Sequence, residues 1–292
     1  MKKAIKLLSL VLAVVMCVFC FAACGTEGDS STVNNSVASS ATGSTEENQK
    51  SIVVGYTIYE PMNYQDENGK LIGFDTELAE KIFGDLGYKV IFKEIQWENK
   101  YTDLNAGTID CIWKGFTCNT ADDDVVMRAD KVDFSYNYME NRQAIVVKAD
   151  SGIAAAADLN GKIGTAEAGS AGEGYAKGFE GAVIKSVTKQ TDGLMEVNAG
   201  TADFAAVDVQ LARSYCGKGD YANLTFVEAL SSEVEFYAIG FKKGSDLTAK
   251  VNAELEKLGA DGTITALAEK YGVENTAIID FSDQKPFADD EK

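Results

Sequence analysis

The sequence predicts an α/β protein made of two similar lobes, each built from parallel βαβ units. The first observation is a repeat: Asn105–Asp110 reads NAGTID, and Asn198–Asp203 reads NAGTAD. In both copies a glycine ends a short helix, and an apolar run typical of a buried strand follows. Because strands that alternate with helices form parallel βαβ units, each copy predicts one α/β lobe.

The other elements of each lobe follow in the expected order. Each copy is preceded by an earlier strand, at Ser51–Gly55 in the first and at Lys162–Thr165 in the second. In the first copy, Asp75 is placed to cap a helix that ends at Gly87. The apolar positions of this helix recur every four residues, at Leu78, Ile82 and Leu86. Val90–Phe92 then predicts the next strand.

The composition excludes several kinds of chemistry. The chain has 292 residues and no histidine. It therefore offers no Ser-His-Asp or Cys-His nucleophile, no imidazole base and no histidine ligand for zinc. Phosphate backbones and anionic lipids would repel its formal net charge of −18. We therefore expect no nucleic-acid partner and no role that depends on lying along a membrane surface.

The first 23 residues form a predicted secretory signal. Lysines near the start precede an uncharged apolar run, Leu7–Ala23, which indicates a signal peptide rather than a spanning helix. The end of this run, together with Cys24, resembles the lipobox of bacterial lipoproteins, in which the cysteine is lipidated. Phe21 stands where leucine is more usual. The alternative is that Cys24 is an ordinary small residue beside a standard cleavage site.

Residues 24–50 are predicted to be the lipidated cysteine and a flexible linker. The segment is rich in Gly, Ser, Thr, Asn and Glu and has almost no large apolar side chain. Burial therefore cannot offset the entropy lost on ordering it. We expect it to tether the folded body to a lipid.

Three cysteines remain after the predicted signal and Cys24, at positions 111, 118 and 216. Their number and spacing give neither a disulfide framework nor a metal site. Two alternatives stay open for the first two. Cys111 and Cys118 either form a bridge across a strand-to-loop turn or are buried free thiols.

The predicted fold also places a ligand site between the two lobes, because open parallel sheets bind ligands beyond the carboxyl ends of their strands. Gly115 and Asp208 each follow the repeat by the same spacing, so we expect them to face each other across a cleft. Tyr56–Glu60 and Ala168–Gly172 are expected at the same cleft. The second segment is either a helix start whose N–H groups bind an anion or a plain Gly/Ser helix start.

A series of short motifs occurs in a fixed order through the folded body. They are Asp66–Asp75, Thr108–Asp110 through Gly115–Thr117, Val132–Ser135, Leu159–Lys162, Gly200–Asp203 through Asp208, and Ala260–Thr263 with Glu269–Gly272. The ordered set resembles the extracytoplasmic solute-binding proteins of ABC importers, in particular the family that binds polar amino acids. The resemblance covers about residues 51–273.

This resemblance implies a fold of two Rossmann-like α/β lobes joined by two crossover strands, the type II periplasmic-binding-protein fold. Lobe 1 is expected at residues 51–141 plus 237–292, and lobe 2 at residues 142–236. The crossovers are expected at Arg142–Lys148 and Glu235–Phe241. The two lobes would close on the ligand.

The resemblance also implies how a free amino acid is held, since both of its charges must be paired when water is expelled. In the family an arginine and helix N–H groups of lobe 2 bind the carboxylate. A lobe 2 aspartate, a glycine carbonyl and a threonine hydroxyl bind the ammonium. The matching positions are Gly115, Thr117 and Asp208, with Ser170, Ala171 and Gly172 at the helix start.

The arginine position is assigned to Arg128. The usual spacing of the family falls on Asp122, whereas counting back from Val132–Ser135 reaches Arg128. The alternative is a surface role for Arg128, with Arg142 as the carboxylate ligand. The acidic run Asp122–Asp124 is expected to be a solvated helix start.

The side-chain end of the expected site is altered from the family pattern. Trp97 matches an aromatic residue that packs on the ligand side chain, the alternative being a core tryptophan. Thr57 stands where many relatives have aspartate, and Glu60 where they often have tyrosine. Lys114 and Glu167 lie within reach of the same end, although Lys114 could equally pair with a neighbouring acid. These charges predict a polar ligand side chain.

Together these features predict a lipid-anchored, monomeric receptor that captures a polar amino acid outside the cell and delivers it to a membrane permease. We expect no cofactor, no metal and no catalytic residue. One alternative is an exported dehydratase on the same fold, with Glu60 or Glu167 as general acid or base. Another is a sensor that presents its ligand to a separate receptor.

Overall fold

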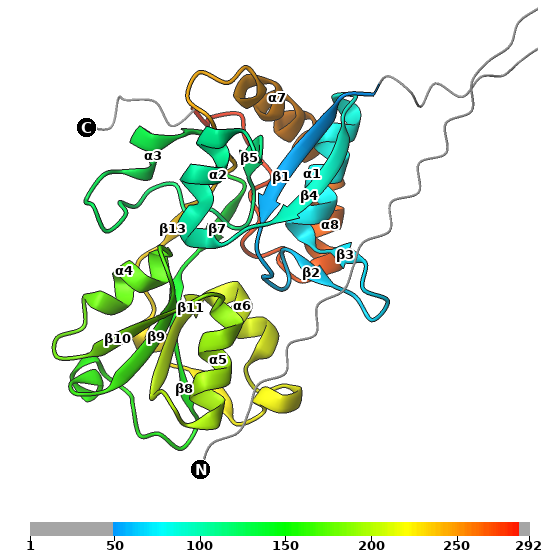
Figure 1. Cartoon of the computed structure of the whole chain (residues 1–292). Helices are drawn as coiled ribbons and strands as arrows, with labels where there is room; N and C mark the ends of the chain where they lie inside the picture. Colours follow the sequence, from blue (N-terminus) through cyan, green and yellow to red (C-terminus); the bar gives the residue numbers. More distant parts are fainter. Residues whose placement is uncertain (1–48, 286–292) are drawn as a thin grey trace, which may run out of the picture. The chain divides into compact units, whose positions relative to one another are not determined.

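The computed structural model describes residues 49–285, and the predicted signal, Cys24 and nearly all of the linker lie outside them. Within the described range, no helix has both the length and the apolar composition needed to cross a membrane. The described residues form two α/β lobes, each around a five-stranded sheet (Figure 1). The predicted fold class is therefore confirmed.

Lobe 1 is the part built on the first sheet, whose strand order is β4-β1-β5-β14-β6. These strands are β1 (Ser51–Tyr56), β4 (Lys89–Glu94), β5 (Cys111–Ile112), β6 (Asp133–Phe134) and β14 (Gly240–Phe241). β1 runs parallel to β4 and β5, and β14 is antiparallel to β5 and β6. A small antiparallel pair, β2 (Tyr64–Gln65) and β3 (Leu71–Ile72), follows β1 in the chain.

Lobe 2 is the part built on the second sheet, whose strand order is β10-β9-β11-β8-β12. Its strands are β8 (Gln143–Lys148), β9 (Ile163–Glu167), β10 (Val183–Val187), β11 (Phe204–Asp208) and β12 (Leu224–Phe226). β9 is parallel to β10 and β11, and β8 is antiparallel to β11 and β12. The strands predicted at the start of each lobe and at Val90–Phe92 are confirmed.

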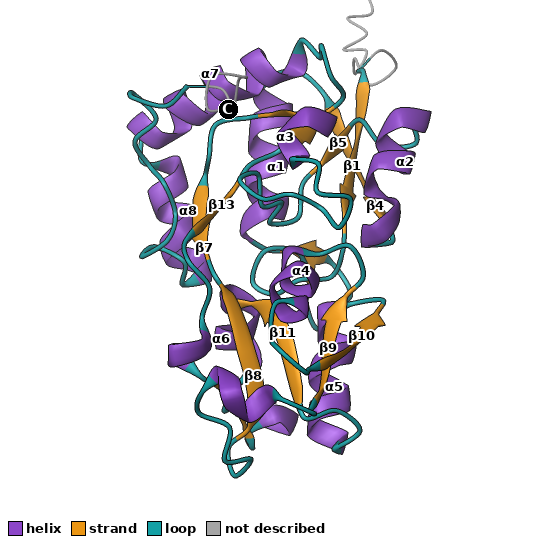
Figure 2. Ribbon diagram, turned by 90° about the vertical axis from the view of Figure 1, so that its left-hand side faces the viewer, coloured by secondary structure: helices purple, strands orange, loops and turns teal. Residues whose placement is uncertain are grey.

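An antiparallel ladder of β7 (Met139–Asn141) and β13 (Glu235–Tyr237) runs between the two sheets (Figure 2). The first crossover was expected at Arg142–Lys148, but most of that segment is β8 of the second sheet. The burial of each strand gives the reason. β8 is buried at nearly every position, as befits a strand between two others, whereas β7 alternates buried and exposed residues.

The helices surround these sheets. The α-helices are α1 (Phe74–Asp85), α2 (Lys100–Ala106), α3 (Arg128–Lys131), α4 (Ala171–Lys177), α5 (Gln190–Ala199), α6 (Val209–Tyr215), α7 (Leu247–Ala260) and α8 (Thr263–Tyr271). Short 3₁₀ helices are η1 (Trp97–Asn99), η2 (Ala156–Leu159), η3 (Gly219–Tyr221) and η4 (Glu228–Leu230). Alternate residues of β11 face different helices. Phe204 and Ala206 pack in one cluster with Ala176 of α4, while Ala205 and Val207 pack in another with Leu194 of α5.

The predicted helix ends are confirmed at the repeat. Gly107 and Gly200 end α2 and α5 in the left-handed conformation, with φ of 72° and 78°. The predicted cap at Asp75 is wrong: α1 begins at Phe74, and Asp75 lies inside its first turn. The carboxylate of Asp75 is turned inward, where it accepts a hydrogen bond from the amide of Gly115. Within the described residues, Cys111, Cys118 and Cys216 are free thiols, and the first two are buried. Of the two alternatives for Cys111 and Cys118, the structure shows the buried free thiols.

Candidate functional site

A buried ion pair joins the two lobes at the carboxyl ends of their strands. Lys114 follows β5 of lobe 1, and Glu167 is the last residue of β9 in lobe 2. Lys114 Nζ lies 2.7 Å from Glu167 Oε2, and the two side chains are 2% and 1% exposed. Burial raises the pKa of Glu167, and the nearby Lys114 ammonium offsets part of that rise. Of the two roles weighed for Lys114, the structure shows the pairing with an acid.

Two aromatic rings lie beside the Lys114 ammonium. Its Nζ is 4.6 Å from the centre of the Trp97 ring and 5.4 Å from that of Tyr59. Both distances are within the range of cation–π attraction. Trp97 is the first residue of η1 and packs edge-on against Phe116, so it has the contacts of a core residue as well as a place at the lobe boundary.

A second lysine, which the sequence did not single out, lies at the same boundary. Lys100 begins α2 and is buried. Its Nζ donates to the carbonyl of Gly169 in lobe 2, at 3.0 Å, and lies 4.9 Å from the centre of the Trp97 ring. Burial and the nearby Arg128 charge lower the pKa of Lys100 to about 7. The site therefore contains a lysine that titrates near neutrality.

Arg128 is also buried at the boundary, at 1% exposure. Its Nε donates to Asp122 Oδ1 at 2.8 Å, and its two terminal nitrogens donate to the carbonyls of Thr117 and Gly169. Arg142, the alternative carboxylate ligand, is exposed and donates to the carbonyl of Ser232. The geometry therefore favours Arg128 over Arg142 as a candidate to bind a ligand carboxylate.

The acidic run beside Arg128 is not the solvated helix start that was expected. Asp122–Asp124 lies in a turn closed by a bridge between Ala121 and Met127. Asp122 is drawn inward because Arg128 and Lys131 both donate to it. Partial burial raises the pKa of Asp122, but these two cations lower it to about 2. Asp122 is thus the fixed counter-charge of Arg128.

Two carboxylates, Asp208 and Glu235, share their hydrogen-bond donors. Asn141 Nδ2 donates to Asp208 Oδ1 at 2.9 Å and to Glu235 Oε1 at 2.6 Å. Gln143 Nε2 donates to the same two oxygens, each at 2.7 Å. Burial and the Asp208 charge raise the pKa of Glu235. Gln190 also donates to Asp208, so this pair is held by amide side chains of β7, β8 and α5.

Thr117 and Gly115 connect this carboxylate pair to lobe 1. Thr117 Oγ1 donates to Glu235 Oε1 at 2.9 Å. Gly115 has a φ of 53°, and a Cβ there would lie 2.6 Å from the Tyr59 ring and 2.8 Å from the Tyr237 ring. Only glycine fits this position without displacing a ring. Thr117 is therefore bonded to Glu235, which shares the donors Asn141 and Gln143 with Asp208, and Gly115 packs against the rings of Tyr59 and Tyr237.

The predicted helix start of lobe 2 has a specific local structure. Ser170 is the N-cap of α4, and its hydroxyl accepts a hydrogen bond from the amide of Glu173. Gly172 packs so closely against the start of β8 that a Cβ would be 2.8 Å from Gln143 Oε1. Ala171 is half-buried between them. The turn just before this cap, at Gly169, is the one that Lys100 and Arg128 contact from lobe 1.

Thr57 and Glu60 lie beyond the end of β1. Thr57 is buried, and its hydroxyl has no hydrogen-bond partner within the described residues. Glu60 is half-buried, and its carboxylate, together with burial, raises the pKa of Tyr215 of α6 to about 12. Glu60 therefore interacts with Tyr215 of α6, and it also helps to raise the pKa of Tyr64 of β2, where burial is the larger cause.

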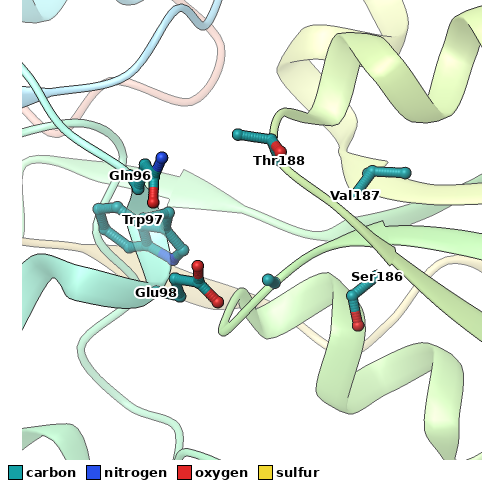
Figure 3. Close-up of a pocket in the computed structure, with 7 residues that line it drawn as sticks. Gln96, Trp97, Glu98, Ser186, Val187 and Thr188 are labelled. Carbon is teal, nitrogen blue, oxygen red and sulfur yellow. The ribbon is translucent and has the colours of Figure 1, made fainter.

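A cavity of about 240 Å³ opens beside Trp97, between the two lobes (Figure 3). It is lined by Gln96, Trp97, Glu98, Ala168, Ser186, Val187 and Thr188. Gln96–Glu98 lie on one side and Ser186–Thr188 on the other. The lobes also meet through two exposed ion pairs, Lys177 with Asp123 and Lys189 with Glu94.

Most of the sequence matches the model of a known protein family. The model of the bacterial extracellular solute-binding proteins, family 3, matches residues 52–274. The chain belongs to this family.

Relatives of this family 3 protein are named for amino-acid binding. The arginine-binding extracellular protein ArtP of Bacillus subtilis (strain 168) is 28% identical over 267 residues, which cover 90% of this chain and 96% of ArtP. A probable amino-acid ABC transporter-binding protein of Haemophilus influenzae (strain ATCC 51907 / DSM 11121 / KW20 / Rd) is 30% identical over 234 residues, which cover 79% of this chain and 88% of that protein. Among solved structures, an ancestral arginine-binding protein bound to arginine has 33% sequence identity and a TM-score of 0.69. The match covers 76% of this chain and 97% of that protein.

Several buried residues at the boundary between the lobes were missed in the sequence. Lys100 and Glu235 are both buried where the lobes meet, as is Tyr59, which belongs to the segment Tyr56–Glu60 that was expected at the cleft. Asn141 ends β7 and Gln143 begins β8, on either side of the exposed Arg142, so this polar pair at alternate positions was an available signal. Lys100 gave no such signal, because its burial depends on Gly169, a residue distant in the sequence.

Proposed function

We propose that this chain captures a free amino acid between its two lobes, outside the cytoplasm, and delivers it to the permease of an ABC importer. Membership of the extracellular solute-binding family supports the class of function. The observation that carries the proposal is the separation of charge at the lobe boundary. Arg128 and Lys100 lie at one place, facing Gly169, and Asp208 and Glu235 lie at another.

This separation fits the two charges of an amino acid. The ligand carboxylate would be bound by Arg128, with Lys100 as a second cation and the start of α4 as a further donor. The ligand ammonium would be bound by Asp208 and by the Thr117 hydroxyl and Gly115 carbonyl of lobe 1. Glu235 lies one hydrogen-bonded group away from Asp208 and would add to the negative potential there.

Lobe closure would couple binding to delivery. A ligand held by Arg128 in lobe 1 and Asp208 in lobe 2 contacts both lobes only when they are together, so binding favours the closed population. The ladder of β7 and β13 is the place about which the lobes would turn. The permease would then recognise the closed form.

The remaining parts of the proposal concern location and assembly. The signal at residues 1–23 would direct export, and lipidation of Cys24 would hold the chain at the outer face of the membrane. The linker would let a monomeric body reach the permease.

A binding protein fits these groups better than an enzyme does. A dehydratase would need a free general acid or base in the cleft. Glu167 is paired with Lys114, Lys100 donates to the carbonyl of Gly169, and Glu60 acts on tyrosines of β2 and α6. We therefore propose no catalytic residue.

The experiment is a thermal-shift screen of the refolded chain against the twenty amino acids, cystine and ornithine. Ligand well above its Kd stabilises the folded state by mass action, so a rise of several degrees with one or a few related amino acids is expected. No shift with any of them would contradict amino-acid capture.

A further inference from the structure

The groups around Lys114 form a cation site that the chain fills with its own side chain. We call the set of Lys114, Glu167, Trp97 and Tyr59 the Lys114 pocket. The ammonium lies over both rings, at 4.6 Å and 5.4 Å from their centres, and 2.7 Å from Glu167 Oε2. Two aromatic faces and a carboxylate are the groups that recognise ammonium and guanidinium ions. The place that a ligand cation would take is therefore held by Lys114.

A further positive group borders the same pocket. Lys100 Nζ lies 4.9 Å from the centre of the Trp97 ring, and Lys100 is buried. A ligand with a cationic side chain would place a second cation beside the Lys114 ammonium, on the ring that Lys100 also contacts. Like charges repel strongly in a region with little water, and Glu167, the carboxylate that faces this ammonium, is already paired with Lys114. The pocket therefore disfavours a cation from the ligand.

The pocket also contains an acceptor without a donor. Glu167 Oε1 is buried and has no hydrogen-bond partner within the described residues. The Thr57 hydroxyl, beyond the end of β1, is in the same state. A buried acceptor left unpaired is costly, so a ligand that donates a hydrogen bond to it gains affinity. A carboxamide or hydroxyl supplies that donor without adding charge.

We propose that Lys114 excludes amino acids with cationic side chains, and that this chain takes an amino acid whose side chain is uncharged and donates a hydrogen bond. The inference rests on the amino-acid capture proposed above and names the substrate class of that site. It sets this chain apart from the relatives named for arginine, although the fold and the family are the same.

The test is a charge cycle at positions 114 and 167, measured by isothermal titration calorimetry on the purified full-length chain. The probes are arginine, lysine, glutamate and the uncharged polar amino acids. The wild type is expected to bind at least one uncharged polar amino acid, and arginine about a hundredfold more weakly. Lys114→Ala leaves Glu167 and both rings open to the ligand, so arginine affinity is expected to rise about tenfold or more.

The matched control is Lys114→Ala combined with Glu167→Ala. This double variant opens the same volume without the carboxylate, so the gain in arginine affinity is expected to disappear. Equal gains in the single and double variants would show that volume alone matters, and would overturn the proposal. Tight binding of arginine or lysine by the wild type would overturn it too.

A second variant, Glu167→Gln, leaves a positive charge in the pocket where Lys114→Ala leaves a negative one. It also keeps the proposal testable if Lys114→Ala does not fold. Glu167→Gln keeps the volume and leaves Lys114 as an unpaired cation. It is expected to raise glutamate affinity about tenfold and to leave arginine unbound. A folded Glu167→Gln variant without that gain would contradict the role of the pocket. If the wild type binds none of these probes and is stabilised by none of the amino acids in the thermal-shift screen, amino-acid capture itself is wrong, which is a different outcome from binding only charged ones.

Discussion

The amide of Gly115 donates a 2.9 Å hydrogen bond to Oδ2 of Asp75, in the first turn of α1. Gly115 lies between Lys114 and Thr117, so this bond fixes the loop of lobe 1 that carries both side chains. Burial raises the pKa of Asp75 to about 7, even though hydrogen bonds from Gly115 and Asn63 oppose the rise. The loop therefore rests on a carboxyl group that titrates near neutral pH.

Asp75→Asn is expected to flatten the pH dependence of stability. The folded-state pKa of Asp75 lies above its ordinary value of 3.8, so its contribution is complete below about pH 4 and is lost as pH rises through about 7. Asparagine keeps an oxygen for the Gly115 amide and carries no charge. Urea unfolding between about pH 4 and pH 8 measures this. Near pH 8 the free energy of unfolding of the variant should exceed that of the wild type by on the order of 1–3 kcal/mol. An unchanged pH profile would contradict this role.

Arg128→Ala is expected to weaken amino-acid binding by about 3–5 kcal/mol, because the ligand carboxylate would be buried without its partner. The same change leaves Asp122 without its buried counter-charge, so stability should fall as well. Arg142→Ala is the matched control, since Arg142 is exposed and contacts Ser232. Calorimetric titration of both variants checks the prediction, and equal effects would reject Arg128 as the carboxylate ligand.

Glu235→Gln is expected to stabilise the ligand-free protein. Burial and the Asp208 charge raise the pKa of Glu235, so its ionised form is unfavourable as pH rises through that value. Glutamine keeps the oxygen that accepts from Thr117, Asn141 and Gln143 while removing the charge. Chemical unfolding near pH 8 should show a gain of about 1 kcal/mol, with weaker amino-acid binding. A loss of stability would mean that the Glu235 charge is itself stabilising.

Lys100→Met is expected to stabilise the protein most at low pH. The pKa of Lys100 is lowered from 10.5 to about 7, so the folded state resists protonation, and wild-type stability rises with pH between those values. Methionine keeps the apolar stem without the charge, at the expense of the bond to Gly169. Thermal unfolding near pH 6 and pH 10 measures the difference. Lys89→Met, at an exposed position, is the control and should change stability by less than about 0.5 kcal/mol.

The topology of the fold explains how much of the site could be predicted. Gly115 and Asp208 follow matching strands in the two halves of the sequence, and ligand sites of parallel sheets lie at the carboxyl ends of strands. The structure bonds Thr117 to Glu235, which shares its donors with Asp208, and packs Gly115 beside Tyr59. This part of the arrangement follows from strand order, which the repeat reveals.

The residues that were missed depend on contacts between distant segments. Lysine and glutamate are mostly exposed, so nothing local predicts the burial of Lys100 or Glu235. Lys100 donates to the carbonyl of Gly169 in lobe 2, and Glu235 accepts a hydrogen bond from Thr117 of lobe 1, so both contacts join segments that are far apart in the sequence. The role of Asp75 was mistaken for the same reason. Asp75 occupies a position in the sequence that is typical of a helix cap, but the packing of the loop directs its carboxylate to Gly115.

Lobe 1 begins first in the chain, but the position of β14 means that its sheet is completed after the sheet of lobe 2. β14 pairs with both β5 and β6, yet it follows every strand of lobe 2 in the chain. A nascent chain emerges N-terminus first, so the uninterrupted run from β8 to β12 can complete its sheet while β5 and β6 still lack the strand between them. The lobe that starts the chain is therefore the last to be completed, and its open strand edges are the part of the newborn protein that most needs protection from aggregation.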